Sequence, residues 1–198
     1  MNKYNPNIHH RKSIRLKGYN YSQAGLYFVT ICVQNRKCLF GKIENGEMIL
    51  NDAGQMVENE WLKISQRFTN VQLHEYVVMP NHFHAIFQIV ATLVVAQNEK
   101  TVALVTVSLV DTQNKTRRPQ GFAPTKPKTI GDMVGAFQSI VTVEYIRGVK
   151  NLGWVPFNGK LWQRNYWEHI IRNEQSYQRI SKYIINNPNN WGNDKLYK

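Results

Sequence analysis

The sequence has few of the features that mark secreted or membrane-spanning proteins. Its 198 residues include only two cysteines, Cys32 and Cys38, and these do not form a Cys-x-x-Cys pair. We therefore expect reduced thiols in a cytoplasmic protein rather than a disulfide scaffold. No apolar run is long enough to span a membrane, and residues 1–21 lack the apolar stretch of a signal peptide.

Acidic residues are also scarce. Asp and Glu total 13 against 25 Lys and Arg, which gives a net charge of +12. This excess favours a polyanionic partner, most simply nucleic acid. The alternative is a basic surface that only aids solubility. Ten Tyr and five Trp supply rings on which bases could stack, although most aromatic side chains belong to protein cores.

The chain divides into an arm, one domain and a tail. Residues 1–24 form a basic N-terminal arm, residues 25–191 a single domain with an insert at about 91–128, and residues 192–198 a polar tail. The insert contains two β-prone segments, which could extend a sheet as a hairpin, and then a Pro-containing basic loop with Arg117 and Arg118. We expect the insert either to guide DNA or to be a tolerated surface insertion.

Periodicity and turn residues predict an α+β domain. The expected strands cover 25–34, 39–43, 47–50, 73–79, 82–89 and a short segment at 161–163, and the expected helices begin near Asp52, Thr129 and Asn173. Asn45-Gly46 predicts a tight hairpin, Asp52 is the expected cap of the first helix, and Gly148 is the expected end of the second. This order fits a ferredoxin-like sandwich that has an antiparallel sheet, helices mainly on one face and a further C-terminal helix.

The stretch Met79-Pro80-Asn81-His82-Phe83-His84 places two histidines one residue apart in a predicted strand. Side chains alternate between the faces of a strand, so His82 and His84 project from the same side. The apolar residues between and after them then face the core. Two imidazoles on one face can hold a divalent metal, but a bare His-x-His is more often a pair of polar residues on a half-exposed strand.

Two later motifs favour the metal site over a pair of ordinary polar residues. One is Trp162-Gln163-x-x-Tyr166-Trp167-Glu168-His169, and the other is Tyr183-Ile184-x-x-Asn187-Pro188. Together with the paired histidines they resemble the HUH single-tyrosine transposases, and within these the REP-associated tyrosine transposase branch. The resemblance extends roughly from Gly25 to Trp191, apart from the insert, and the combination of motifs is specific.

The resemblance implies a ferredoxin-like fold and a set of site residues. Tyr183 would be the nucleophile, and His82, His84 and Asn187 would bind Mg²⁺ or Mn²⁺. The implied substrate is single-stranded DNA with hairpin structure, which is cleaved through a 5′-phosphotyrosine intermediate that leaves a free 3′-OH. The resemblance leaves open whether the protein is a monomer or a homodimer.

The tryptophan-rich motif suggests contacts with DNA. Arg164 could hold a phosphate and Trp167 could stack on a base, whereas Trp162 reads as a core residue. His169 is either a site histidine or a polar partner of Glu168, and we do not count it among the metal ligands.

Two other readings compete with a transposase. A replication-initiator or relaxase nickase shares the paired histidines, but the tryptophan-rich motif argues against it. A non-catalytic nucleic-acid-binding module would keep the charge and the aromatic residues without needing His82, His84, Tyr183 and Asn187 together. Convergence of these four side chains around one metal-sized space would favour the enzyme.

Overall fold

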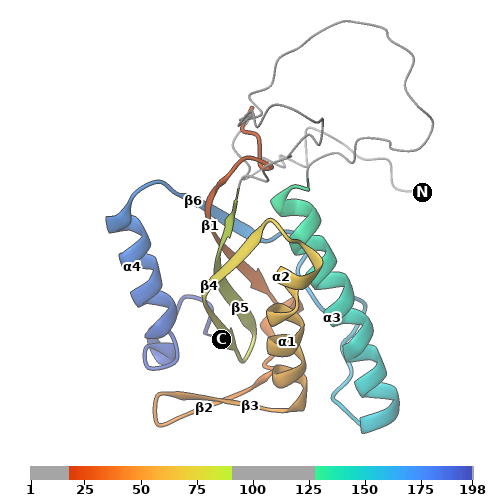
Figure 1. The fold of residues 1–198 in the computed structure, drawn as a ribbon. Coiled ribbons are helices and arrows are strands. Elements are labelled where there is room, and N and C mark those ends of the chain that lie inside the picture. The colour runs from red at the N-terminus through yellow and green to blue at the C-terminus, as the bar shows by residue number, and fades with distance from the viewer. Residues whose placement is uncertain (1–17, 91–127, 198) are drawn as a thin grey trace, which may run out of the picture.

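The computed structural model describes residues 18–90 and 128–197, whose centre is a four-stranded antiparallel sheet (Figure 1). Its strands are β1 (Gly25–Cys32), β4 (Val71–Met79), β5 (His82–Ile89) and β6 (Trp167–Ile171). They lie in the order β4-β5-β1-β6, with β5 and β1 in the middle. Together with a helix after β1 and another after β5, this is the predicted ferredoxin-like topology.

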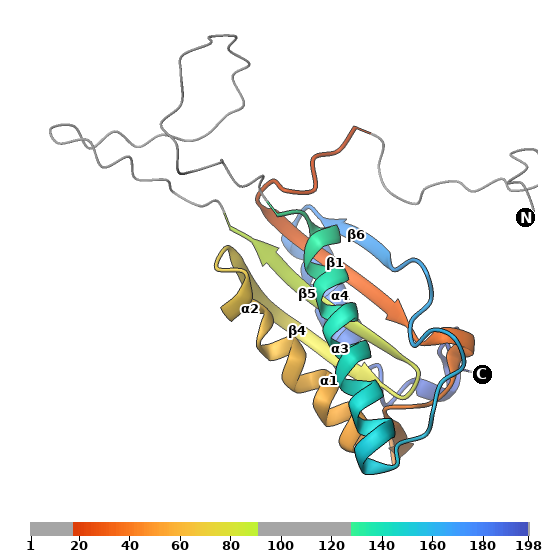
Figure 2. The same cartoon turned by 90° about the vertical axis from the view of Figure 1, so that its right-hand side faces the viewer.

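Helices cover both faces of the sheet, but unequally. Helices α1 (Asp52–Leu62) and α3 (Ile130–Leu152) share one face, while α4 (Glu174–Ile185) lies on the other (Figures 1 and 2). The prediction of helices mainly on one face, plus a separate C-terminal helix, is therefore confirmed. A short helix, α2 (Ile64–Arg67), follows α1.

The alternation of side chains along the strands divides the core into two parts. On the α1/α3 face, the buried strand residues Val29, Ile31, Phe83 and Phe87 belong to the main core cluster with residues such as Trp61. The opposite face has a smaller apolar cluster in which α4 packs on the sheet, made of Phe28, Ile86, Ile171, Ile180 and Ile184. This smaller cluster leaves room on the α4 face for polar side chains.

The hairpin prediction is confirmed. Strands β2 (Gly41–Glu44) and β3 (Glu47–Leu50) pair in an antiparallel ribbon with Asn45 and Gly46 at its tip. Both tip residues have positive φ, 52° and 80°. A two-residue turn with two left-handed residues suits the right-handed twist of the flanking strands.

Two predicted helix boundaries were wrong. Asn51, not Asp52, caps α1, because its side chain accepts a hydrogen bond from the backbone N–H of Gly54. Helix α3 begins at the predicted Thr129 capping box but runs past Gly148 to Leu152, with left-handed Gly153 as its cap. Gly148 is instead required by packing, since a Cβ atom there would lie 2.2 Å from the ring of Trp154.

The strand predicted at 161–163 was also misplaced. Trp162 forms only an isolated bridge with Val33, and its indole is buried in the main core with Nε1 donating to the carbonyl of Gln138. The edge strand is β6, which begins within the tryptophan-rich motif and pairs with β1 from Leu26 to Thr30. Two 3-10 turns complete the described elements, η1 (Gln34–Arg36) and η2 (Trp191–Asn193).

Some expectations concern residues that the structure does not describe. Most of the basic arm and almost all of the insert, including Arg117 and Arg118, lie outside the described residues. Within the described part of the chain, no helix has the length and apolarity needed to cross a membrane.

Candidate metal and nucleophile site

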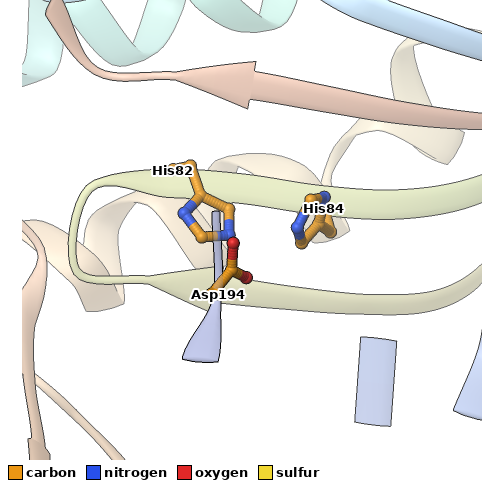
Figure 3. Close-up of side chains that lie close together, drawn as sticks. All are labelled: His82, His84 and Asp194. Atoms are coloured by element: carbon orange, nitrogen blue, oxygen red, sulfur yellow. The ribbon is translucent and has the colours of Figure 1, made fainter. Parts of the chain in front are cut away.

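The paired histidines lie where the sequence places them, on the α4 face of the central strand β5 (Figure 3). Their ring centroids are 4.4 Å apart, and both rings are buried. The intervening Phe83 packs in the main core on the other face. Although His82 and His84 are buried, several of their neighbours are polar, which distinguishes their surroundings from the apolar core.

A neighbouring side chain orients each imidazole. Oδ1 of Asn81 lies 2.7 Å from Nδ1 of His82, and the Asn81 amide nitrogen donates to the carbonyls of Arg36 and Leu196. Because an amide oxygen can only accept, Nδ1 of His82 donates and its Nε2 keeps a free lone pair. Nδ1 of His84 is 2.8 Å from Oγ1 of Thr30, which leaves Nε2 of His84 turned to the site. Partners of this kind fix the ring orientation of metal-ligating histidines.

Tyr183 reaches the site from α4. Its hydroxyl oxygen lies 3.2 Å from Nε2 of His84, and its ring centroid lies 5.2 Å from the imidazole centroid. The Tyr183 side chain is 45% exposed, so one side of the ring remains open to solvent. Tyr183 therefore contacts His84 through its hydroxyl while part of its side chain stays exposed.

Asn187 lies just beyond the end of α4 rather than on the helix, because α4 ends at Ile185. Asn187 is nevertheless buried. Its amide nitrogen donates to Oδ2 of Asp194 at 3.0 Å. Its Oδ1 and the Nε2 atom of His82 are buried without a hydrogen-bond partner among the described residues.

Asp194 is the site residue that the sequence analysis missed. One carboxylate oxygen of Asp194 and one ring nitrogen of each histidine lie within 4.8 Å of one another (Figure 3). The turn η2 brings Asp194 here, and the backbone N–H of Leu196 donates to Oδ1 of Asp194. An isolated acidic residue in a polar tail carries no motif, so only the three-dimensional arrangement shows this proximity.

The C-terminal turn is held against the site by several contacts. The ring of Trp191 lies against that of His82, with centroids 5.8 Å apart, and the guanidinium of Arg36 donates to the carbonyl of Lys195. Arg36 and Asn35 both have positive φ in η1, a conformation that non-glycine residues rarely adopt. This turn at the end of β1 therefore helps to fix the segment that includes Asp194.

Burial controls the protonation of the site. It lowers the pKa of His82 to about 4, although the charge of Asp194 and the amide of Asn187 oppose the shift. Burial, with the neighbouring His82, also holds the pKa of His84 well below its usual value. Both imidazoles are thus neutral near pH 7, the form that binds metal. Burial and the Asp194 charge raise the pKa of Tyr183, so its hydroxyl is protonated.

The arrangement has the chemistry of a divalent-metal site. Two imidazole nitrogens, an amide oxygen and a carboxylate oxygen are ligand types that transition metals and Mg²⁺ accept in proteins. Two of these atoms, Nε2 of His82 and Oδ1 of Asn187, are buried and have no hydrogen-bond partner within the part of the chain that the structure describes. Such atoms are rare, because desolvation without a partner is costly, so the donor set fits a bound cation.

Of the predicted DNA contacts, the structure describes Trp167 and Arg164. Trp167, on the edge strand β6, is 49% exposed and meets Phe28 edge to face, while Arg164 is exposed. His169 stacks on Trp167 and does not join the metal cluster.

Comparisons with known proteins found similarity both in sequence and in structure. An uncharacterised protein of Haemophilus influenzae is 43% identical over 198 residues, a match that covers 98% of this chain and 97% of the relative. A solved REP-associated tyrosine transposase, bound to a REP hairpin, superposes with a TM-score of 0.52 at 18% identity, covering 91% of this chain and 76% of that one. No family model matches the sequence.

Proposed function

We propose, from the premise that this chain belongs to one family with the Haemophilus influenzae protein and has the fold of a REP-associated tyrosine transposase, that it is a transposase. It would cleave and rejoin single-stranded DNA at hairpin-associated sites through a 5′-phosphotyrosine intermediate. The observation that carries the proposal is the 3.2 Å contact between the Tyr183 hydroxyl and Nε2 of His84, one of the two buried histidines.

The metal ligands would be His82, His84 and Asn187, with Asp194 as a fourth group that supplies negative charge. The buried lone pairs on His82 and Asn187 support this set. Bound Mg²⁺ or Mn²⁺ would polarise a phosphate oxygen of the DNA and neutralise charge that develops there.

The chain's own residues prepare the nucleophile. Thr30 holds Nδ1 of His84, which turns its Nε2 towards the Tyr183 hydroxyl. Because Nε2 has one lone pair, it accepts the hydroxyl hydrogen bond only while it is not bound to a metal. Attack of the Tyr183 oxygen on phosphorus forms one P–O bond and breaks the bond to the 3′ oxygen, which leaves as a hydroxyl with one proton. The numbers of P–O and O–H bonds are unchanged, so a second 3′-OH can reverse the step and join strands without ATP.

The DNA strand would lie across the open side of Tyr183. Trp167 is exposed on the neighbouring strand β6 and would stack on a base, and Arg164 would contact a phosphate. A hairpin-forming substrate is supported by the structural relative, which was solved with a REP hairpin. Arg117 and Arg118 belong to the insert and are proposed as further phosphate contacts.

A covalent-adduct assay tests the proposal. Single-stranded DNA from the regions that flank the gene, labelled at its 3′ end, is incubated with the protein and Mn²⁺ and run on a denaturing gel. The wild type should carry the label, and Tyr183→Phe should not. Tyr76→Phe is the matched control, since the Tyr76 hydroxyl bonds to Glu58 on the opposite face of the sheet.

Two outcomes would redirect the proposal. An adduct formed by Tyr183→Phe would assign the nucleophile to another residue, with Tyr166 and Tyr177 as the next to test. A wild type that binds hairpin-bearing DNA but never forms an adduct would make a non-catalytic binding module the better description.

A further inference from the structure

A pocket distinct from the metal cluster lies at the junction of β6 and the N-terminal half of α4. Its volume is about 640 Å³, within the range of small-ligand sites. His169, Arg172, Ser176 and Arg179 contribute to its lining. Arg172 and Arg179 are exposed, and neither guanidinium has an ion-pair partner among the described residues. The pocket thus offers two guanidinium groups whose charge is not offset by a described carboxylate contact.

A row of aromatic rings connects this pocket to the nucleophile. The ring of Phe28 meets those of both Tyr183 and Trp167 edge to face, with centroids 6.3 Å and 5.7 Å apart. Trp167 in turn lies parallel to the imidazole of His169, at 5.9 Å and an interplanar angle of 3°. Because His169 also lines the pocket, the row runs from Tyr183 across Phe28 and Trp167 to the pocket.

The aromatic side chains and the arginines around the pocket offer different kinds of contact. Trp167 and His169 offer ring faces, on which any base can stack, whereas Arg172 and Arg179 offer donors that match phosphate oxygens. Glu168 also lines the pocket, but it pairs with Val29 and so lies on the opposite sheet face from His169, which pairs with Phe28. Its carboxylate disfavours a phosphate on that wall and leaves the arginine wall for the anion.

We infer that the pocket between β6 and α4 is a nucleotide subsite for the single strand that flanks the cleaved phosphodiester. Arg172 and Arg179 hold a phosphate of this nucleotide, and the Trp167–His169 pair stacks on its base. The inference rests on the proposed function, because the row of rings places the nucleotide next to the phosphate that Tyr183 attacks. This subsite would help to set the position of the single-stranded DNA during cleavage.

The test measures binding without cleavage. Each variant is made in the full chain with Tyr183→Phe, and affinity for a fluorescent oligodeoxythymidine of about 12 nucleotides is measured in chelator over a range of salt. Removal of Arg172 and Arg179 together, as R172A/R179A, should raise Kd about tenfold and reduce the slope of log K against log salt by roughly 0.7, the value for one phosphate contact on a single strand. The charge-matched control is R147A/K150A, which removes two exposed cations from α3 and should change both quantities much less.

Trp167 tests the stacking part of the subsite. Trp167→Ala should raise Kd about tenfold, whereas Trp167→Phe, which keeps a ring face, should recover most of the affinity. Equal Kd values and salt slopes for R172A/R179A and R147A/K150A would overturn the subsite. Binding that depends on the pocket, in a protein whose wild type forms no adduct, would keep the subsite and reject the transposase. If the wild type forms an adduct but R172A/R179A and R147A/K150A have equal Kd values and salt slopes, the transposase is kept and the subsite is rejected.

Discussion

Oδ1 of Asn81 lies 2.7 Å from Nδ1 of His82, and the same side chain joins the histidine strand to the C-terminal turn. Asn81 is fully buried, and its amide nitrogen donates to the carbonyl of Leu196, two residues after Asp194. One side chain therefore fixes the tautomer of His82 and tethers the segment that presents the carboxylate.

Asn81→Ala should weaken Mn²⁺ binding by about 10- to 100-fold, the usual cost of removing a partner that orients a metal-ligating histidine. Isothermal titration calorimetry of the purified protein measures the change. Asn59→Ala, an exposed position on α1 across the sheet, is the matched control. An Asn81→Ala protein with wild-type affinity would show that the strand alone orients His82.

Asp194→Asn should weaken Mn²⁺ binding by about tenfold or more. The substitution keeps the shape and the acceptor for the Leu196 N–H, but it removes a negative charge that lies within 4.8 Å of the histidine nitrogens. Asp52→Asn, at the exposed start of α1, makes the same chemical change away from the site. If both variants bind Mn²⁺ equally well, Asp194 is not part of the metal site.

The sequence predicted the topology and the histidine face well because both depend on local patterns. Alternation in β5 separates His82 and His84 from Phe83, and Asn45-Gly46 is a turn that few other dipeptides favour. These signals are read within a few residues, so the central strand and the face bearing the histidines could be assigned without distant contacts.

The errors arose where distant contacts decide the structure. Gly148 looked like a helix stop, but it is in the helix interior because the Trp154 ring packs against it. Trp162 lies in the core without forming a strand, and the edge strand is β6, a segment for which the sequence predicts DNA contacts. Asp194 enters the site through a turn that Asn81 and Arg36 hold in place, and a single sequence contains no signal for that arrangement.

Tyr177→Phe should reduce stability but spare the chemistry. The Tyr177 hydroxyl donates to the Glu75 carboxylate at 3.0 Å and lies 3.2 Å from Nδ1 of His74, which ties α4 to the edge strand β4. Loss of this half-buried contact should lower the free energy of unfolding by about 1 kcal/mol, measured by urea denaturation. Adduct formation should stay close to wild type, because this hydroxyl does not touch the metal cluster. A complete loss of adduct at unchanged stability would mean that Tyr177 takes part in the reaction.

Acid should destabilise the metal-free protein between about pH 6.5 and pH 4. Burial lowers the pKa of His82 to about 4 and that of His84 well below its usual value, whereas both imidazoles titrate near 6.5 when unfolded. The unfolded chain therefore binds more protons than the folded chain in this window, so stability is full above about pH 6.5 and falls as the pH decreases. At about pH 5.5, these two imidazoles should together bind nearly two protons from the solvent when the chain unfolds. Most carboxyl groups are already ionised at this pH, so they add little to the proton uptake. Urea denaturation in chelator from about pH 5.5 to 7.5 gives the pH dependence of the unfolding free energy, and hence the number of protons taken up. His82→Gln should reduce this number by about one. A midpoint independent of pH would show that the histidine pair does not stay neutral in the folded protein.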